Sequence, residues 1–73
     1  MSREQILAML LSNGAISLIH TIEDVESGRA RRVRIDPIPG SPAFTREVMQ
    51  YLYSLGAQVE IAHPVQRSHV RTA

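Results

Sequence analysis

The chain opens with apolar residues at helical spacing, which share one side of a 3.6-residue period: Ile6, Leu7, Leu10 and Leu11. Ser2 precedes this run as an N-cap, and Gln5 stands three residues later, which is the spacing of a capping box. Asn13-Gly14 ends the run, because glycine adopts the left-handed conformation after a helix without a steric penalty. The pattern predicts a first helix over residues 3–12.

The next run, residues 15–22, is apolar and rich in β-branched residues, which favours a strand. Its alternation would turn four residues toward the core: Ile16, Leu18, His20 and Ile22. Residues 31–38 alternate more clearly between polar and apolar positions. The Ser27-Gly28 step between the two runs is typical of a tight turn. We therefore expect residues 15–38 to form a β-hairpin.

A turn at Ser27-Gly28 would set acidic residues of one strand opposite arginines of the other. The facing pairs would be Glu26 with Arg29, Asp24 with Arg31, Glu23 with Arg32, and Ile22 with Val33. Cross-strand pairs of opposite charge stabilise a hairpin by about 0.2–1 kcal/mol each. Such pairing would leave little free positive potential, whereas arginines turned to solvent away from these carboxylates would favour an anionic partner.

Two further elements follow the predicted hairpin. Pro37 and Pro39 end its second strand, because proline has no N–H for the ladder. Ser41-Pro42 begins a second helix as N-cap and first helical residue. The apolar stripe of this helix comprises Phe44, Val48, Tyr51, Leu52 and Leu55. Residues 58–63 alternate again, which predicts a third strand.

The predicted order of elements is αββαβ. The simplest arrangement is a single small α+β domain over residues 1–64. It has a three-stranded, mostly antiparallel sheet in the order 2-1-3, with both helices packed on one face. The connection from the second strand to the third through a helix should be right-handed. Residues 65–73 would form a flexible C-terminal tail, and a short fourth strand over residues 65–70 is the alternative.

Composition adds constraints on size and location. The chain has 73 residues, no cysteine and a formal net charge of +1. A domain of this size buries only about 60% of its unfolded surface, so self-association is expected. No apolar run reaches the roughly 20 residues of a membrane span, and the N-terminus lacks a signal-peptide pattern. These features favour a cytoplasmic protein without a membrane partner.

No motif for catalysis, cofactor binding or metal binding stands out. The histidines His20, His63 and His69 lack metal-ligand spacing, and no cysteine supports them. His20 is expected to be a hydrogen-bonded core residue. Glu23 and Asp24 would point to opposite faces of a strand and could not converge on one substrate. We therefore expect no enzyme, no catalytic residue, no cofactor and no metal.

Two surfaces remain as candidates for binding. The first is a cluster of four arginines, which could contact nucleic acid or another anionic partner: Arg29, Arg31, Arg32 and Arg34. The second is a protein interface formed by Ile19 on the bare sheet face and by Met49 and Tyr53 on the second helix. The sequence predicts a small non-enzymatic interaction module, accessory or regulatory and homodimeric. The alternative is a nucleic-acid-binding protein that uses the arginines.

Overall fold

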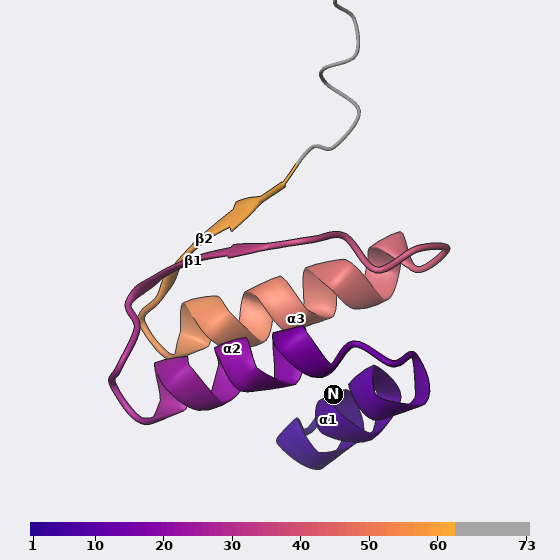
Figure 1. Cartoon of the computed structure of the whole chain (residues 1–73), viewed down its shortest axis with the longest axis horizontal. Coiled ribbons are helices and arrows are strands. Elements are labelled where there is room, and N and C mark those ends of the chain that lie inside the picture. The colour runs from indigo at the N-terminus through magenta and orange to yellow at the C-terminus, as the bar shows by residue number, and fades with distance from the viewer. Residues whose placement is uncertain (63–73) are drawn as a thin grey trace, which may run out of the picture.

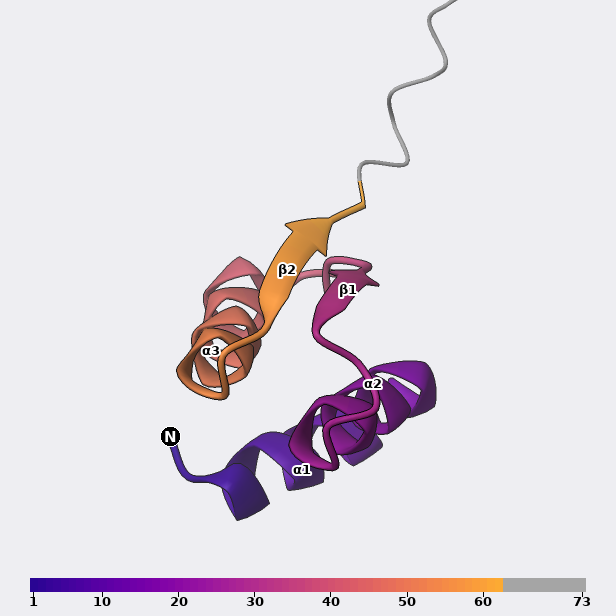
Figure 2. The same ribbon diagram turned by 90° about the vertical axis from the view of Figure 1, so that its left-hand side faces the viewer.

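A computed structural model describes residues 1–62, which form three helices and two strands (Figure 1). The elements are α1 (Arg3–Ser12), α2 (Ile16–Glu26), β1 (Arg32–Ile35), α3 (Pro42–Ser54) and β2 (Gln58–Ile61). β1 and β2 lie side by side and parallel, and together they form a two-stranded sheet. The helices lie on one side of this sheet, with β2 above α3 and β1 above α2 (Figure 2).

The predicted three-stranded antiparallel sheet is wrong, because its first strand is a helix. Residues 16–26 form α2, and the N–H of Ser27 donates to the C=O of Glu23 at 3.0 Å where a hairpin turn was expected. The buried positions Leu18, Ile22 and Val25 have helical spacing. Leu18 and Ile22 are four residues apart, so they share one face in a helix and also in a strand. Val25 shares that face only in a helix, and it lies beyond the predicted strand.

The first helix is confirmed with its predicted bounds. The Ser2 hydroxyl accepts from the N–H of Gln5 at 3.2 Å, and the Gln5 side chain accepts from the N–H of Ser2 at 2.8 Å, which completes the capping box. Ile6 and Leu10 are buried, but Leu11 is 63% exposed. α1 contacts α2 and α3 and buries only a narrow stripe between them.

The second half of the domain has the predicted strand–helix–strand order, β1–α3–β2, but the two strands pair directly instead of flanking a third strand. Val33 pairs with Val59 and Ile35 with Ile61 in the parallel register. β2 ends at Ile61, two residues before the predicted end. His63, His69, the tail over residues 65–73 and the alternative strand over residues 65–70 lie outside the described residues.

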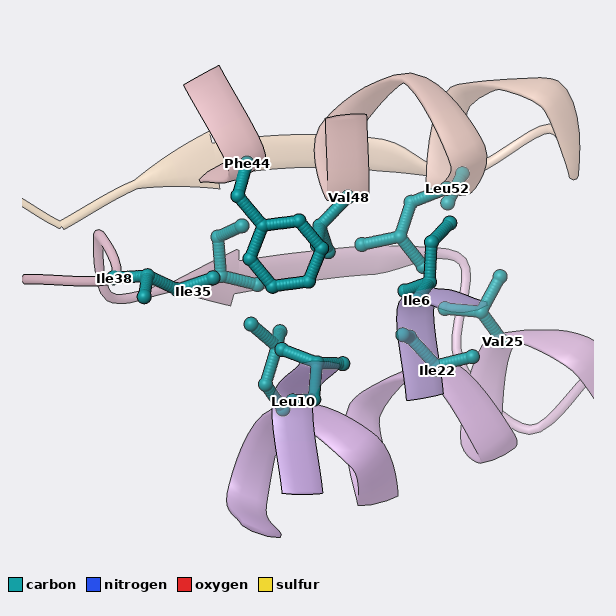
Figure 3. Packing of buried hydrophobic residues seen from close by; sticks show 11 residues of the cluster. Ile6, Leu10, Ile22, Val25, Ile35, Ile38, Phe44, Val48 and Leu52 are labelled. Carbon is teal, nitrogen blue, oxygen red and sulfur yellow. The ribbon is translucent and has the colours of Figure 1, made fainter. Parts of the chain in front are cut away.

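One hydrophobic core connects the helices with the sheet (Figure 3). Its fully buried side chains are Ile6, Leu10, Ile22, Val48 and Leu52. Phe44 and Ile35 extend the core toward the N-terminal end of α3. The predicted stripe of α3 is confirmed at Phe44, Val48 and Leu52, whereas Leu55 is 41% exposed because it follows the last helical residue.

Thr45 fixes the loop between β1 and α3. Its hydroxyl accepts from the N–H of Ile38 at 3.0 Å and donates to the C=O of Ser41 at 3.0 Å. Thr45 is the buried polar residue among those described, at 6% exposure. Ser41 stands at the N-cap as predicted, but its side chain makes no capping bond.

Candidate functional site

Two of the four predicted arginines lie together on the outer face of the sheet. Arg32 and Arg34 alternate along β1 with inward-facing residues. The neighbouring positions on β2 are Gln58 and Glu60. Arg32 Nε donates to Gln58 Oε1 at 3.3 Å, and Arg34 Nη2 lies 3.5 Å from Glu60 Oε1. Both members of the Arg34–Glu60 pair are about two-thirds exposed or more, at 71% and 67%.

The other two arginines precede β1. Arg29 Nε lies 3.9 Å from Asp24 Oδ1 and donates to the Ser27 hydroxyl at 3.4 Å. Arg31 is exposed beside the turn at residues 55–57. Its C=O accepts from the N–H of Gln58 at 2.8 Å, which fixes its backbone at the start of the sheet.

The predicted charge pairs are wrong, because α2 directs its carboxylates elsewhere. Glu23 lies beside His20, Asp24 lies beside Arg29, and Glu26 binds Arg3. Within residues 1–62, Arg31 and Arg32 have no carboxylate within 4.0 Å. These two arginines are therefore exposed away from carboxylates, which is the arrangement expected to favour an anionic partner.

A polar cluster that the sequence did not predict joins the three helices. Glu26 at the end of α2 accepts from Arg3 Nε at 2.6 Å and from Arg3 Nη2 at 3.0 Å. The Tyr51 hydroxyl of α3 donates to the same carboxylate at 2.6 Å. Arg3 and Glu26 are 23 residues apart. Patterns of neighbouring residues do not predict a contact over this separation in the sequence.

This cluster is organised to hold a charge rather than to transfer a proton. Hydrogen bonds from Arg3 and then from Tyr51 lower the pKa of Glu26, and partial desolvation opposes them. The hydrogen bond to Glu26 raises the pKa of Tyr51. Acid–base catalysis needs a pKa close to the working pH, and both groups are moved away from neutrality. The cluster therefore ties α1, α2 and α3 together.

Glu26→Gln is expected to lower the thermal midpoint at pH 7 by about 2–6 °C. The folded pKa of Glu26 lies below its ordinary value of 4.5, so the ionised carboxylate stabilises the fold above that value. This contribution is lost as the pH falls through the lower, folded pKa. Thermal unfolding followed by circular dichroism should therefore show the midpoints of the two proteins converging in acid.

Glu47→Gln is the matched control, because Glu47 forms no ion pair within residues 1–62. Its midpoint should follow that of the unaltered protein across the same pH range. If the thermal midpoint of Glu26→Gln differs from that of the unaltered protein by the same amount at neutral and acidic pH, the ionised carboxylate has no stabilising role.

His20 is not the core residue that the sequence predicted. It lies on α2 with a side chain that is 69% exposed, and its Nδ1 is 3.5 Å from Glu23 Oε1. Among residues 1–62, no group of three or more histidine, cysteine, aspartate and glutamate side chains is arranged to hold a metal ion.

The predicted interface residues come from two helices. Ile19 lies on α2 rather than on a sheet face, and it packs against the core, as Met49 does. Tyr53 is 50% exposed, and its hydroxyl donates to the C=O of Val59 at 3.4 Å. Tyr53 therefore offers most of the apolar surface available from this set.

A groove of about 470 Å³ runs between α2 and the segment that contains the end of β1. One wall is Ser17, Leu18 and Thr21 of α2, and the other begins with Arg34, Ile35 and Asp36. The groove holds one arginine and one aspartate, without a histidine or a second carboxylate.

Comparison with family models, curated proteins and solved structures found no match to this chain. None of the helices within residues 1–62 is long and apolar enough to cross a membrane.

Proposed function

We propose that the chain is a small, non-enzymatic interaction module that binds nucleic acid through Arg29, Arg31, Arg32 and Arg34. The observation that supports this proposal is the exposure of Arg31 and Arg32 without a carboxylate within 4.0 Å among residues 1–62. A cytoplasmic location belongs to the same proposal.

The spacing of the arginines on β1 suits a phosphate backbone. Alternate residues of a strand point to the same face and lie about 6–7 Å apart, so Arg32 and Arg34 can reach different phosphates. The exposed pair of Arg34 with Glu60 is weak, because surface ion pairs contribute about 0–1 kcal/mol. A phosphate can therefore replace Glu60 at little cost.

The Arg31→Gln/Arg32→Gln variant is expected to weaken nucleic-acid binding and to reduce its salt dependence. Each phosphate contact contributes about 0.9 to the slope of log affinity against log salt for duplex DNA. Loss of two contacts should therefore reduce the slope by roughly 2. Fluorescence anisotropy with labelled duplex and single-stranded oligonucleotides over a range of salt concentrations measures this slope.

Arg46→Gln is the control, because Arg46 is an exposed arginine that lies on α3 and not on β1. It should leave the slope unchanged, and circular dichroism should show that both variants fold. If the unaltered protein shows no salt-sensitive binding to oligonucleotides or heparin, the nucleic-acid proposal fails.

A protein partner is the second candidate function. It is favoured by large apolar side chains that remain exposed among the described residues: Met1, Met9, Leu11, Ile16, Tyr53 and Leu55. Tyrosine is common at the centres of interfaces, which makes Tyr53 the residue to examine first. Failure of the oligonucleotide experiment would leave this candidate as the main one.

A further inference from the structure

One edge of the two-stranded sheet carries backbone groups without partners among residues 1–62. The C=O groups of Arg31 and Ile35 accept from the N–H groups of Gln58 and Ala62 at 2.8 and 2.9 Å. Backbone groups alternate in direction along a strand, so those of Arg32 and Arg34 point to the opposite edge. Asp36 directly follows β1 and precedes Pro37, which favours extended backbone, so its groups continue the same alternation. No described residue bonds to them there. An uncovered edge of this kind is a template for another strand.

We propose that a second copy of the chain pairs with this edge of β1. The two β1 strands run antiparallel about a two-fold axis and give a four-stranded sheet in the order β2-β1-β1-β2. This inference goes beyond the proposed nucleic-acid binding and does not depend on it. Antiparallel pairing of identical strands is self-complementary, as a two-fold interface requires.

Charge complementarity and the free backbone N–H groups together select the register of this pairing. With Arg34 opposite Arg34 of the second copy, Arg32 of each copy faces Asp36 of the other, which gives two attractive pairs. The one like-charged pair is relieved because each Arg34 already lies 3.5 Å from Glu60 of its own β2. Val33 then faces Ile35 of the second copy on the core side.

The neighbouring registers are less favourable. A register centred on Val33 sets Arg32 opposite Arg34 twice, so that like charges face each other at both positions. A register centred on Ile35 also gives two attractive pairs, Arg34 opposite Asp36 in each direction, but it brings Arg32 opposite Ile38. The N–H of Ile38 already donates to the Thr45 hydroxyl at 3.0 Å, so it is not free for pairing.

The shape of this region accommodates an added strand. The groove of about 470 Å³ lies along the end of β1, with α2 as its other wall. β1 lies on the α2 side of the sheet, away from α3 (Figure 2). Apolar residues of the second β1 strand can therefore enter the groove near Leu18, while the helices of each copy remain on one side of the sheet.

Charge exchange tests the proposal. Asp36→Arg and Arg32→Asp, each alone, place like charges opposite each other twice and should weaken dimerisation by about tenfold or more. The double variant Arg32→Asp/Asp36→Arg restores two attractive pairs and should recover dimerisation. Sedimentation equilibrium of the full chain from about 10 µM to about 1 mM measures the dissociation constants. Glu47→Gln is the control that should leave dimerisation unchanged.

Hydrogen exchange distinguishes the possible occupants of the edge. In a dimer, the amide protons of Arg32, Arg34 and Asp36 should be protected at high concentration and exchange rapidly on dilution. Protection at every concentration in a monomer would mean that the same chain covers the edge and would overturn the proposal. A monomer without protection, or a dimer in which the double variant is no stronger than the single ones, would also overturn it.

Asp36→Arg separates this inference from the proposed function. The substitution removes no arginine from the set assigned to nucleic acid, so oligonucleotide binding by the monomer should persist when dimerisation is lost. If the unaltered protein binds oligonucleotides but stays monomeric, the paired edge alone is rejected. Failure of binding with retained dimerisation would reject the nucleic-acid proposal alone.

Discussion

Leu10→Ala is expected to destabilise the protein by about 2–5 kcal/mol, because it leaves a cavity where α1 meets the rest of the core. Leu10 has no solvent exposure, and α1 contacts both α2 and α3. Small domains have a total stability of roughly 0.05–0.15 kcal/mol per residue. The loss would therefore be a large share of the total, and it should be visible in urea unfolding followed by circular dichroism.

Leu11→Ala is the matched control for this substitution. Leu11 is the next residue on the same helix, but it is 63% exposed. Its replacement removes the same atoms from a surface position and should change the free energy of unfolding by less than about 0.5 kcal/mol. Equal effects of the two substitutions would show that α1 is not docked by Leu10.

Thr45→Val is expected to destabilise the protein by about 1–3 kcal/mol, although valine has nearly the same shape as threonine. The hydroxyl accepts the buried N–H of Ile38 at 3.0 Å, and valine leaves that donor without a partner. Urea unfolding measures the energy. The amide proton of Ile38 provides a local signal, since it should exchange slowly in the unaltered protein and faster in the variant.

Thr45→Ser is the control for the hydroxyl itself. Serine keeps the acceptor for Ile38 and the donor for Ser41 while it removes a methyl group. Slow exchange of the Ile38 amide should therefore be retained, whatever the cost of the lost methyl group. Fast exchange in Thr45→Ser, or slow exchange in Thr45→Val, would show that the hydroxyl does not fix this loop.

Local chemistry in the sequence predicted about half of the fold. The capping box at Ser2 and Gln5 marked the start of α1, and Pro42 at the first helical position marked the start of α3. The alternation around Val33 marked β1. Each of these signals depends on neighbouring residues, so each acts before any tertiary contact forms.

The candidate site was predicted in composition but not in arrangement. The four arginines were identified from the sequence as the most basic cluster, and Arg32 and Arg34 do share one face of β1. Their predicted carboxylate partners depended on a hairpin that does not exist. Once residues 16–26 form a helix, Glu26 binds Arg3 and Tyr51, and Arg31 and Arg32 have no carboxylate within 4.0 Å among residues 1–62.

The sequence by itself determined where α1, β1, α3 and β2 form, because capping residues, prolines and alternation act over a few residues. Tertiary structure decided that residues 16–26 are helical, since this apolar run satisfies either period and only burial of Leu18, Ile22 and Val25 against α1 and the sheet selects one. It also decided the parallel pairing of β1 with β2 and the contact of Glu26 with Arg3, because both join segments more than twenty residues apart.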